Sequence, residues 1–530
     1  MMKKILEISI VFFVLIILIQ SCAVGPNYHQ PEQENTPEVF RNSTATSDTI
    51  INSKWWEIFN DPVLDTLIVK ALANNKNVLI AASRVEQARE NVSFKKADNK
   101  PKVGYSASAN RTNMLFGVPA NNTSTFSVSG NASWELDFWG KFRRGNEAAQ
   151  AELLSSFYGK RAVEVGLVSE VATNYFNLLD YRTSLDISKK TLSSRDSTLI
   201  IIQARFDEGY THIIDVNQAQ IQKAIAQSAV PQFRRLIALT ENNLSVLLGE
   251  SPDDIETYLT FNSYDLPEQI PVGIPAGILQ RRPDILQAEQ NYRAQNAYVG
   301  VAQAMRFPSI SLTGLLGIGS TELSTLLDSG LGWGAAAGIT GPLFEFGKNA
   351  RRVDIEREKA KQSLLQYEYT VLTSMQEVSN ALITIETLEE ELEAKKFRLD
   401  AARNASFLSR KRYFEGVTSY LEVTENQRQE FDAELSYSDN FQSLLNGHVE
   451  LYRALGGGWL SQDEIDKYAQ QVADEQNVDV SEIDKDSLNY NGQIVDLVLT
   501  KEEQQARKDA KKTQRKLERE QKKADRQNNN

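Results

Sequence analysis

The acidic residues near the end of the chain are the side chains best placed to do chemistry. Glu422 and Glu425 are three residues apart, so a helix would carry them on one face. Carboxylates placed in this way attract cations, and they repel one another when they are brought close together. They follow Gly416, which interrupts two long helical patterns within the segment 412–425. The segment is therefore predicted to be a turn at a helix tip.

An earlier copy of this segment lies at Arg205–Gly209, and Asp215 stands at the position that corresponds to Glu422. The shift is 207 residues, from Arg205 to Arg412. The same shift, without a gap, relates Pro101 to Pro308, Gly140 to Gly347, Arg144 to Arg351, Glu170 to Glu377, and Gly249 to Gly456. A register kept over roughly 190 residues predicts two copies of one structural unit, at about 62–249 and 269–456.

Composition argues against several other kinds of site. The net charge of −12 does not favour nucleic acid as a partner, because phosphate binding needs clustered positive charge. The histidines His29, His212 and His448 and the single cysteine, Cys22, have no ligand-like spacing, so no metal or cofactor is expected. No nucleophile, base and oxyanion donor stand at a meaningful spacing, and no phosphate-binding glycine loop is present, so we expect no enzyme.

The first 22 residues have the pattern of a lipoprotein leader. Residues 1–21 begin with two lysines, continue as an apolar run and end directly before Cys22, which predicts a signal peptide followed by a lipidated cysteine. Acyl chains on Cys22 would anchor the protein to a membrane leaflet without spanning it.

The rest of the chain divides by composition and repeat. A tether at 22–54 is rich in Pro, Asn, Ser and Thr, and a tail at 460–530 is first acidic and then basic. Between them we predict a first repeat at 55–249, a linker at 250–268 and a second repeat at 269–459.

Each repeat contains two segments of alternating polarity. They predict strands at about 102–113 and 123–138, joined by a loop at 114–122, and at about 309–318 and 331–342. About ten residues suffice for a tilted strand to cross a bilayer, although a soluble half-buried hairpin gives the same alternation.

The helical segments are unusually long. Gly140–Gly209 and Gly347–Gly416 each predict a helix of about 105 Å. The segments at 77–100 and 213–248 predict about 36 Å and 54 Å, so end to end they nearly match the long helix. We therefore expect each repeat to place one long helix beside two stacked shorter ones, with coiled-coil packing.

Four strands of one chain cannot close a transmembrane barrel, because about eight is the practical minimum. An open strand edge in lipid would leave backbone groups unpaired, so the chain is expected to oligomerise. A barrel shared between subunits and continued by a helical tube would form a conduit across one membrane.

Four motifs resemble those of a known family. They are Trp55-Trp56 with Phe59 and Asp61-Pro62, then the segments 280–285 (QRRPDI), 307–312 (FPSISL) and 455–459 (LGGGW). In this order they resemble the outer-membrane efflux lipoproteins of the TolC type. The tail after Trp459 has no counterpart in that pattern.

The resemblance implies a mainly α fold with membrane β structure. It implies a homotrimer with a 12-stranded outer-membrane β-barrel, continued by a long periplasmic α-helical barrel. It also implies coupling through a periplasmic adaptor protein to an inner-membrane RND-type pump, with this chain as the passive exit duct for drugs or other toxic compounds. By resemblance, Asp215, Tyr413, Glu422 and Glu425 line or latch a periplasmic gate, and Gly209 and Gly416 form the tips.

Two other functions stay open on the sequence. One is an outer-membrane duct for a protein in a type I secretion system. The other is a periplasmic coiled-coil scaffold lipoprotein without a pore. The two glutamates also have a simpler interpretation, as residues of a solvated helix face.

Overall fold

The structure is a computed structural model that describes residues 24–31, 55–115, 118–257, 261, 264, 282–328 and 330–457. The predicted signal peptide 1–21, Cys22, most of the tether and the tail 460–530 lie outside these residues, as do residues 265–281.

Both repeats contain a helix, two strands, a long helix and a further helix in the same order, and they differ in the short elements η1, α2 and η3. The first repeat contains η1 (Trp55–Phe59), α2 (Pro62–Asn74), α3 (Lys76–Asp98), β1 (Lys102–Leu115), β2 (Val118–Leu136), α4 (Lys141–Asp207) and α5 (Ile213–Leu247). The second contains α7 (Pro283–Ala304), β3 (Ser309–Ser320), η3 (Leu323–Thr325), β4 (Gly332–Thr340), α8 (Lys348–Phe414) and α9 (Tyr420–Ala454).

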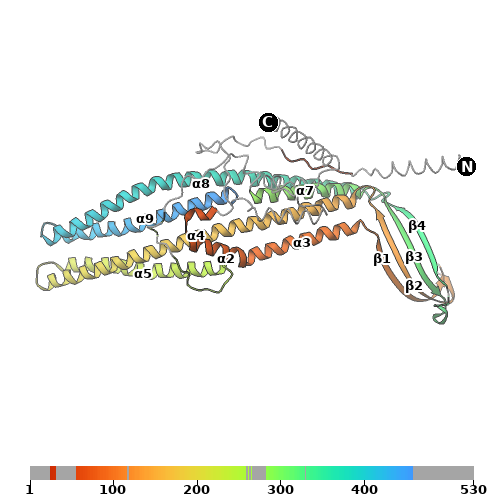
Figure 1. Ribbon diagram of the computed structural model, residues 1–530, viewed down its shortest axis with the longest axis horizontal. Coiled ribbons are helices and arrows are strands. Elements are labelled where there is room, and N and C mark those ends of the chain that lie inside the picture. The colour runs from red at the N-terminus through yellow and green to blue at the C-terminus, as the bar shows by residue number, and fades with distance from the viewer. Residues whose placement is uncertain are drawn as a thin grey trace, which may run out of the picture. The chain divides into compact units, whose positions relative to one another are not determined.

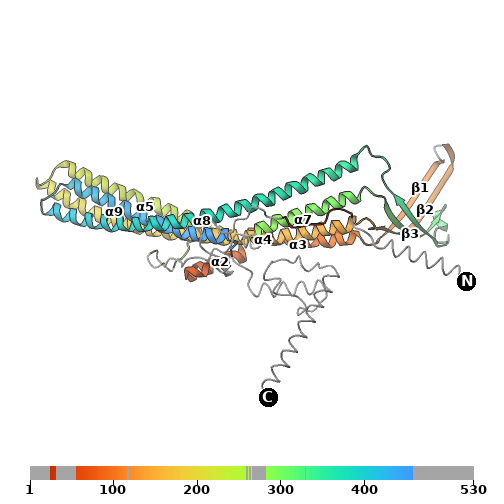
Figure 2. The same ribbon diagram turned by 90° about the horizontal axis from the view of Figure 1, so that it is seen from above.

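The long helices α4 and α8 have 67 residues each, which corresponds to about 100 Å. Both α3 and α5 pack along α4, and both α7 and α9 pack along α8, as the helix lengths predict (Figures 1 and 2). The sheet lies at one end of these helices, and the turns after α4 and α8 lie at the other. Within the described ranges, no helix combines the length and apolar character that a membrane-spanning helix requires.

The four strands form one antiparallel sheet in the order β1-β2-β3-β4, in which β2 and β3 join the two repeats (Figure 1). Because side chains alternate along a strand, the register decides which faces coincide. Trp134 lies opposite Leu312, and Leu312 lies opposite Ala337. One apolar face therefore continues across the strands. On the other face of β1 and β2, serines lie opposite each other, and the hydroxyl oxygens of Ser106 and Ser129 are 2.9 Å apart.

The apolar face of the sheet is exposed in the single chain. Its large side chains include Val103, Tyr105, Trp333 and Ile339, each at least 73% exposed. Large apolar side chains exposed together on one face are typical of a surface that contacts lipid or another chain.

The strand ends differ from the prediction in two places. The strands β1 and β2 continue to Leu115 and from Val118, so most of the predicted loop 114–122 is strand. Pro119 is tolerated because it is the second residue of β2, where one missing N–H disrupts little pairing. The strand β2 ends at Leu136 because Asp137 turns away from it and accepts hydrogen bonds from the backbone N–H groups of Phe142 and Arg143, at 3.0 and 2.8 Å.

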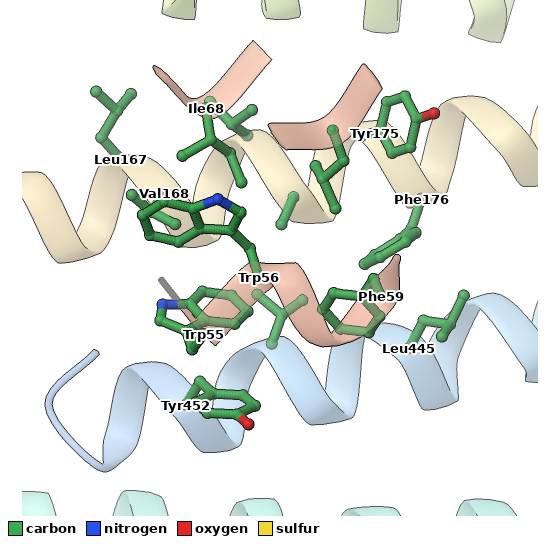
Figure 3. Packing of buried hydrophobic residues seen from close by; sticks show 14 of the residues in the cluster. Trp55, Trp56, Phe59, Ile68, Leu167, Val168, Tyr175, Phe176, Leu445 and Tyr452 are labelled. Atoms are coloured by element: carbon green, nitrogen blue, oxygen red, sulfur yellow. The ribbon is translucent and has the colours of Figure 1, made fainter. Parts of the chain in front are cut away.

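The main hydrophobic core lies where the two repeats meet. Trp55 stacks on Tyr452 of α9 with ring centres 4.7 Å apart, and Phe59 packs edge-on against Phe176 of α4 at 4.8 Å (Figure 3). Asp61 caps α2 by accepting from the N–H of Val63 and is fully buried. This arrangement gives the tryptophan and Asp-Pro motif a structural role.

The Arg-Arg-Pro-Asp motif also has a structural role. Arg282 forms an ion pair of 2.6 Å with Glu377 of α8 and donates to the carbonyl of Ala454 at the end of α9, at 2.9 Å. It also pairs with Asp284. The motif thus fixes the start of α7 against both long elements of the second repeat.

Candidate functional site

Each long helix ends in the same glycine turn. Gly209 and Gly416 have φ angles of 75° and 76°, a left-handed conformation in which a side chain is strained. The N–H groups of Gly209 and Tyr210 donate back to Phe206 and Arg205, the pairing of a Schellman motif. The same pairing surrounds Gly416. No other atom approaches within 4 Å of the place where a Cβ would stand, so backbone conformation alone requires glycine here.

A threonine and an acid follow each turn. Thr211 donates to Asp215 in the first tip, and Thr418 donates to Glu422 in the second. Both acids lie in the first turn of the returning helix, α5 or α9, where the helix dipole favours negative charge. The two repeats therefore build the start of the returning helix in the same way.

The arginines before the two turns have different partners. Arg412 forms an ion pair of 2.7 Å with Glu422, within the second tip. Its equivalent, Arg205, places its guanidinium over the ring of Tyr413, 5.0 Å from the ring centre. Arg205 therefore links the first tip to the second through a cation–π contact.

Glu425 is exposed and has its own cation. Its carboxylate accepts from Arg428 at 2.6 Å and from Gln429 at 2.8 Å. Hydrogen bonds from Arg428 and Gln429 lower the pKa of Glu425 to about 2. Both predicted gate glutamates are thus ion-paired in the single chain.

A small apolar cluster joins the two tips. Tyr413 and Tyr420 lie in it with ring centres 5.3 Å apart, and Ile202, Val216 and Val423 complete its buried part together with Ala219. Burial raises the pKa of Tyr420 to about 12. The hydroxyl of Tyr413 is buried and has no hydrogen-bond partner among the described residues.

The structure brings some of the predicted site residues together and separates others. Tyr413 packs into the tip cluster next to Val216, the neighbour of Asp215 in sequence. Glu422 and Glu425 pair with different arginines, Arg412 and Arg428, and Cys22 lies outside the described residues. Sequence reasoning missed Arg205, Arg412 and Arg428 as partners. For Arg205 and Arg412, the sequence offered one indication, which is that an arginine precedes the glycine in both copies of the turn.

No metal centre accompanies the tips. Across the described ranges, no group of three or more His, Cys, Asp and Glu side chains is arranged to hold a metal ion.

A second ordered feature lies at the sheet end of the helices, where residues 24–31 dock onto α4 and α7. We call this segment the strap. The buried guanidinium of Arg144 donates to the side chain of Asn27 at 2.7 Å and to the carbonyls of Val24 and Gly25. A Cβ on Gly25 would lie 2.4 Å from the Cα of Gly300, so the strap and α7 touch along their backbones.

Further contacts hold the start and the middle of the strap. Tyr28 donates to the buried carboxylate of Glu289 at 2.7 Å, and the N–H of Val24 donates to the carbonyl of Trp139 at 3.2 Å. The sequence predicts an extended tether here, and the structure adds that its first part is fixed to both repeats.

The chain matches known proteins over most of its length. The family model described as "Outer membrane efflux protein" matches twice, at residues 67–250 and 274–457. This double match confirms the predicted repeat.

Individual relatives are also efflux components. The chain is 31% identical to the "Probable efflux pump outer membrane protein TtgC" of Pseudomonas putida over 478 residues, which cover 87% of this chain and 97% of the relative. It is 32% identical to the "Cation efflux system protein CusC" of Escherichia coli O6:H1 over 454 residues, which cover 84% and 98%.

A solved structure agrees with the sequence matches. The open state of the Neisseria gonorrhoeae MtrE outer membrane channel is similar with a TM-score of 0.75 at 29% identity, and the match covers 82% of this chain and 98% of that one. The predicted resemblance is confirmed, and the chain belongs to the outer membrane efflux protein family, with two copies of the family's repeat.

Proposed function

We propose that this protein is the outer-membrane exit duct of a tripartite efflux pump. Three copies would each contribute four strands to a 12-stranded barrel, and their helices would continue it as a periplasmic helical barrel. The observation that carries the proposal is the exposed apolar face shared by all four strands. In the single chain β1 and β4 each have a free edge, which pairing with neighbouring copies would satisfy.

The strap supports a lipid anchor at the same end of the molecule. Consecutive Cα atoms are 3.8 Å apart, so Cys22 lies within about 8 Å of Val24. The N–H of Val24 donates a hydrogen bond to the carbonyl of Trp139, which lies three residues after the end of β2. A diacylglycerol on Cys22 would enter the periplasmic leaflet of the outer membrane beside the barrel.

The tips provide a surface for a periplasmic adaptor. The exposed apolar side chains Tyr210, Ile213 and Ile214 surround the first turn, and Val417 and Leu421 surround the second. An inner-membrane RND-type pump, joined through the adaptor, would supply the energy. The duct itself conducts small molecules such as drugs or other toxic compounds without a chemical step.

The tips would also hold the resting gate. Asp215, Tyr413, Glu422 and Glu425 lie at or beside the turns, where a narrow ring of acidic side chains selects for cations. The arginines paired with Glu422 and Glu425 partly cancel the negative potential of these carboxylates. Loss of the ion pairs during opening would therefore strengthen that negative potential.

Planar-bilayer recording of the purified, lipidated protein tests this function. We expect heat-modifiable trimers and cation-preferring single channels, and we expect the gene to restore drug resistance to cells that lack their own duct. A pore-free scaffold lipoprotein would give neither trimers nor conductance. A protein-secretion duct would conduct ions but leave drug resistance unrestored.

A further inference from the structure

The helices form two hairpins, α4 with α5 and α8 with α9. One arginine, away from the tips, contacts both of them. Arg195 lies in α4, 14 residues before Gly209, or about 20 Å along the helix. Its side chain is buried, with the residue 3% exposed. Its Nη1 donates to the carbonyl of Gln222 in α5 at 2.7 Å, and its Nη2 donates to the carbonyl of Gln427 in α9 at 3.3 Å.

An aromatic ring completes this site. The guanidinium of Arg195 lies over the ring of Phe431, 5.1 Å from its centre, and Phe431 is one turn after Gln427 in α9. Arg195 therefore contacts its own hairpin through α5 and the other hairpin through two residues of α9.

Burying the charged guanidinium of Arg195 costs desolvation free energy. The guanidinium forms no ion pair with any carboxylate of the described residues, and burying a cation without one is unfavourable unless its N–H groups are bonded. A methionine of similar length would fill the site without that cost. What the arginine provides and methionine cannot is the pair of carbonyl bonds, one to Gln222 of α5 in its own hairpin and one to Gln427 of α9 in the other.

The second repeat lacks the equivalent contact. The 207-residue shift relates Arg195 to Ala402, which packs with Leu399 and Ala433 in a cluster confined to α8 and α9. Within the described residues, the contact to both α5 and α9 is therefore made by Arg195 of the first repeat and not by its equivalent in the second.

We infer that Arg195 is a positioning residue of the gate: it fixes α9 on α4 and α5 above the tip cluster, and so limits how far the second hairpin swings when the channel opens. This inference rests on the proposed function. Within it, the tip contacts latch the closed state, and Arg195 sets the pivot around which α8 and α9 move.

Single-channel recording of full-length Arg195→Met tests the inference. Loss of hydrogen bonds from a charged donor is expected to raise the time spent in the high-conductance state about tenfold. Arg403→Met is the matched control, because Arg403 of α8 donates to Glu434 of α9 within one hairpin, at 2.8 Å. Its channels should behave like wild type.

A second variant and a second readout separate positioning from general loss of structure. Phe431→Leu removes the ring from the α9 side and should raise the same open time by a smaller factor. A spin label on Val417→Cys, an exposed tip position, should show a broader distribution of distances between copies in Arg195→Met than in Arg403→Met. If Arg195→Met does not form trimers, the open times of Phe431→Leu and Arg195→Lys are measured instead.

The outcomes are distinct. Wild-type open times in both Arg195→Met and Phe431→Leu, or an equal rise in Arg403→Met, would overturn the role of Arg195. Absence of conductance in the wild type would instead refute the proposed duct.

Discussion

Arg205 of the first tip lies over the ring of Tyr413 of the second, 5.0 Å from its centre, while the equivalent Arg412 pairs with Glu422 in its own tip. Two arginines at the same position of a repeat thus serve different purposes. One joins the hairpins and the other stabilises a single turn.

Tyr413 should act through its ring and not through its hydroxyl. We expect Tyr413→Phe to retain wild-type resting conductance, because the hydroxyl has no partner within the described chain. Tyr413→Ala removes the ring from the buried cluster, at a cost of about 3 kcal/mol, and should open the resting channel. Bilayer recordings of the two variants check this. A strong effect of Tyr413→Phe would show that the hydroxyl bonds to a neighbouring copy.

The tip glutamates should control ion selectivity. Glu422→Ala combined with Glu425→Ala is expected to weaken cation preference and to alter the resting conductance, measured as a reversal potential in a salt gradient and as single-channel current. Arg412→Met with Arg428→Met should act in the opposite direction, because it leaves both carboxylates uncompensated. Identical traces for all three proteins would contradict the gate assignment.

The same acids make a prediction about pH. Glu425 has a folded pKa of about 2, below the ordinary value of 4.5, so its ion pair with Arg428 persists down to that range and is lost as pH falls through it. Channels carrying only Glu422→Ala should therefore still prefer cations at pH 4. Adding Arg428→Met should move the loss of preference to higher pH.

Gly416 should be needed for the turn itself. Gly416→Ala forces an alanine into φ 76° and should cost about 1 kcal/mol, mostly as local fraying. Limited trypsin digestion after Lys411 or Arg412 should become faster. Gly145→Ala is the control, because Gly145 lies inside α4 with open space at its Cβ position, and alanine there favours the helix. Equal digestion rates in the two variants would argue against a strained turn.

His448 should make the fold sensitive to acid. Burial in α9 lowers its pKa from 6.5 to about 4, so between these values the unfolded chain binds a proton that the folded chain does not. Stability therefore falls as pH decreases through that window, by at most about 3 kcal/mol. His448→Leu should reduce the difference between melting temperatures at pH 7 and pH 4.5. His212→Gln, at an exposed position, should leave it unchanged.

The features that follow from local periodicity were predictable from the sequence. The lengths of α4 and α8, the apolar face of the strands and the repeat all depend on spacings that the chain displays directly. The end of β2 at Leu136 was not predictable from the sequence. It depends on Asp137, which accepts hydrogen bonds from the N–H groups of Phe142 and Arg143.

Contacts between distant segments were also beyond prediction. The sequence of the strap is that of a polar tether. Its binding site is formed by Arg144 and Gly300, which are distant from it in the chain. Arg195 gives no signal in sequence, since nothing local distinguishes a helix-face arginine from one that reaches another hairpin.

The junction between β2 and β3 has a consequence for biogenesis. The pairing of Phe126 with Ser320 and of Leu136 with Ile310 joins residues that are far apart in the chain. A two-stranded hairpin is marginally stable alone, so β1 and β2 are expected to become stable only when β3 of the second repeat is present to pair with β2. If the protein assembles in the outer membrane as proposed, the first half alone should be prone to aggregation, so a chain truncated after residue 249 should be degraded rather than assembled.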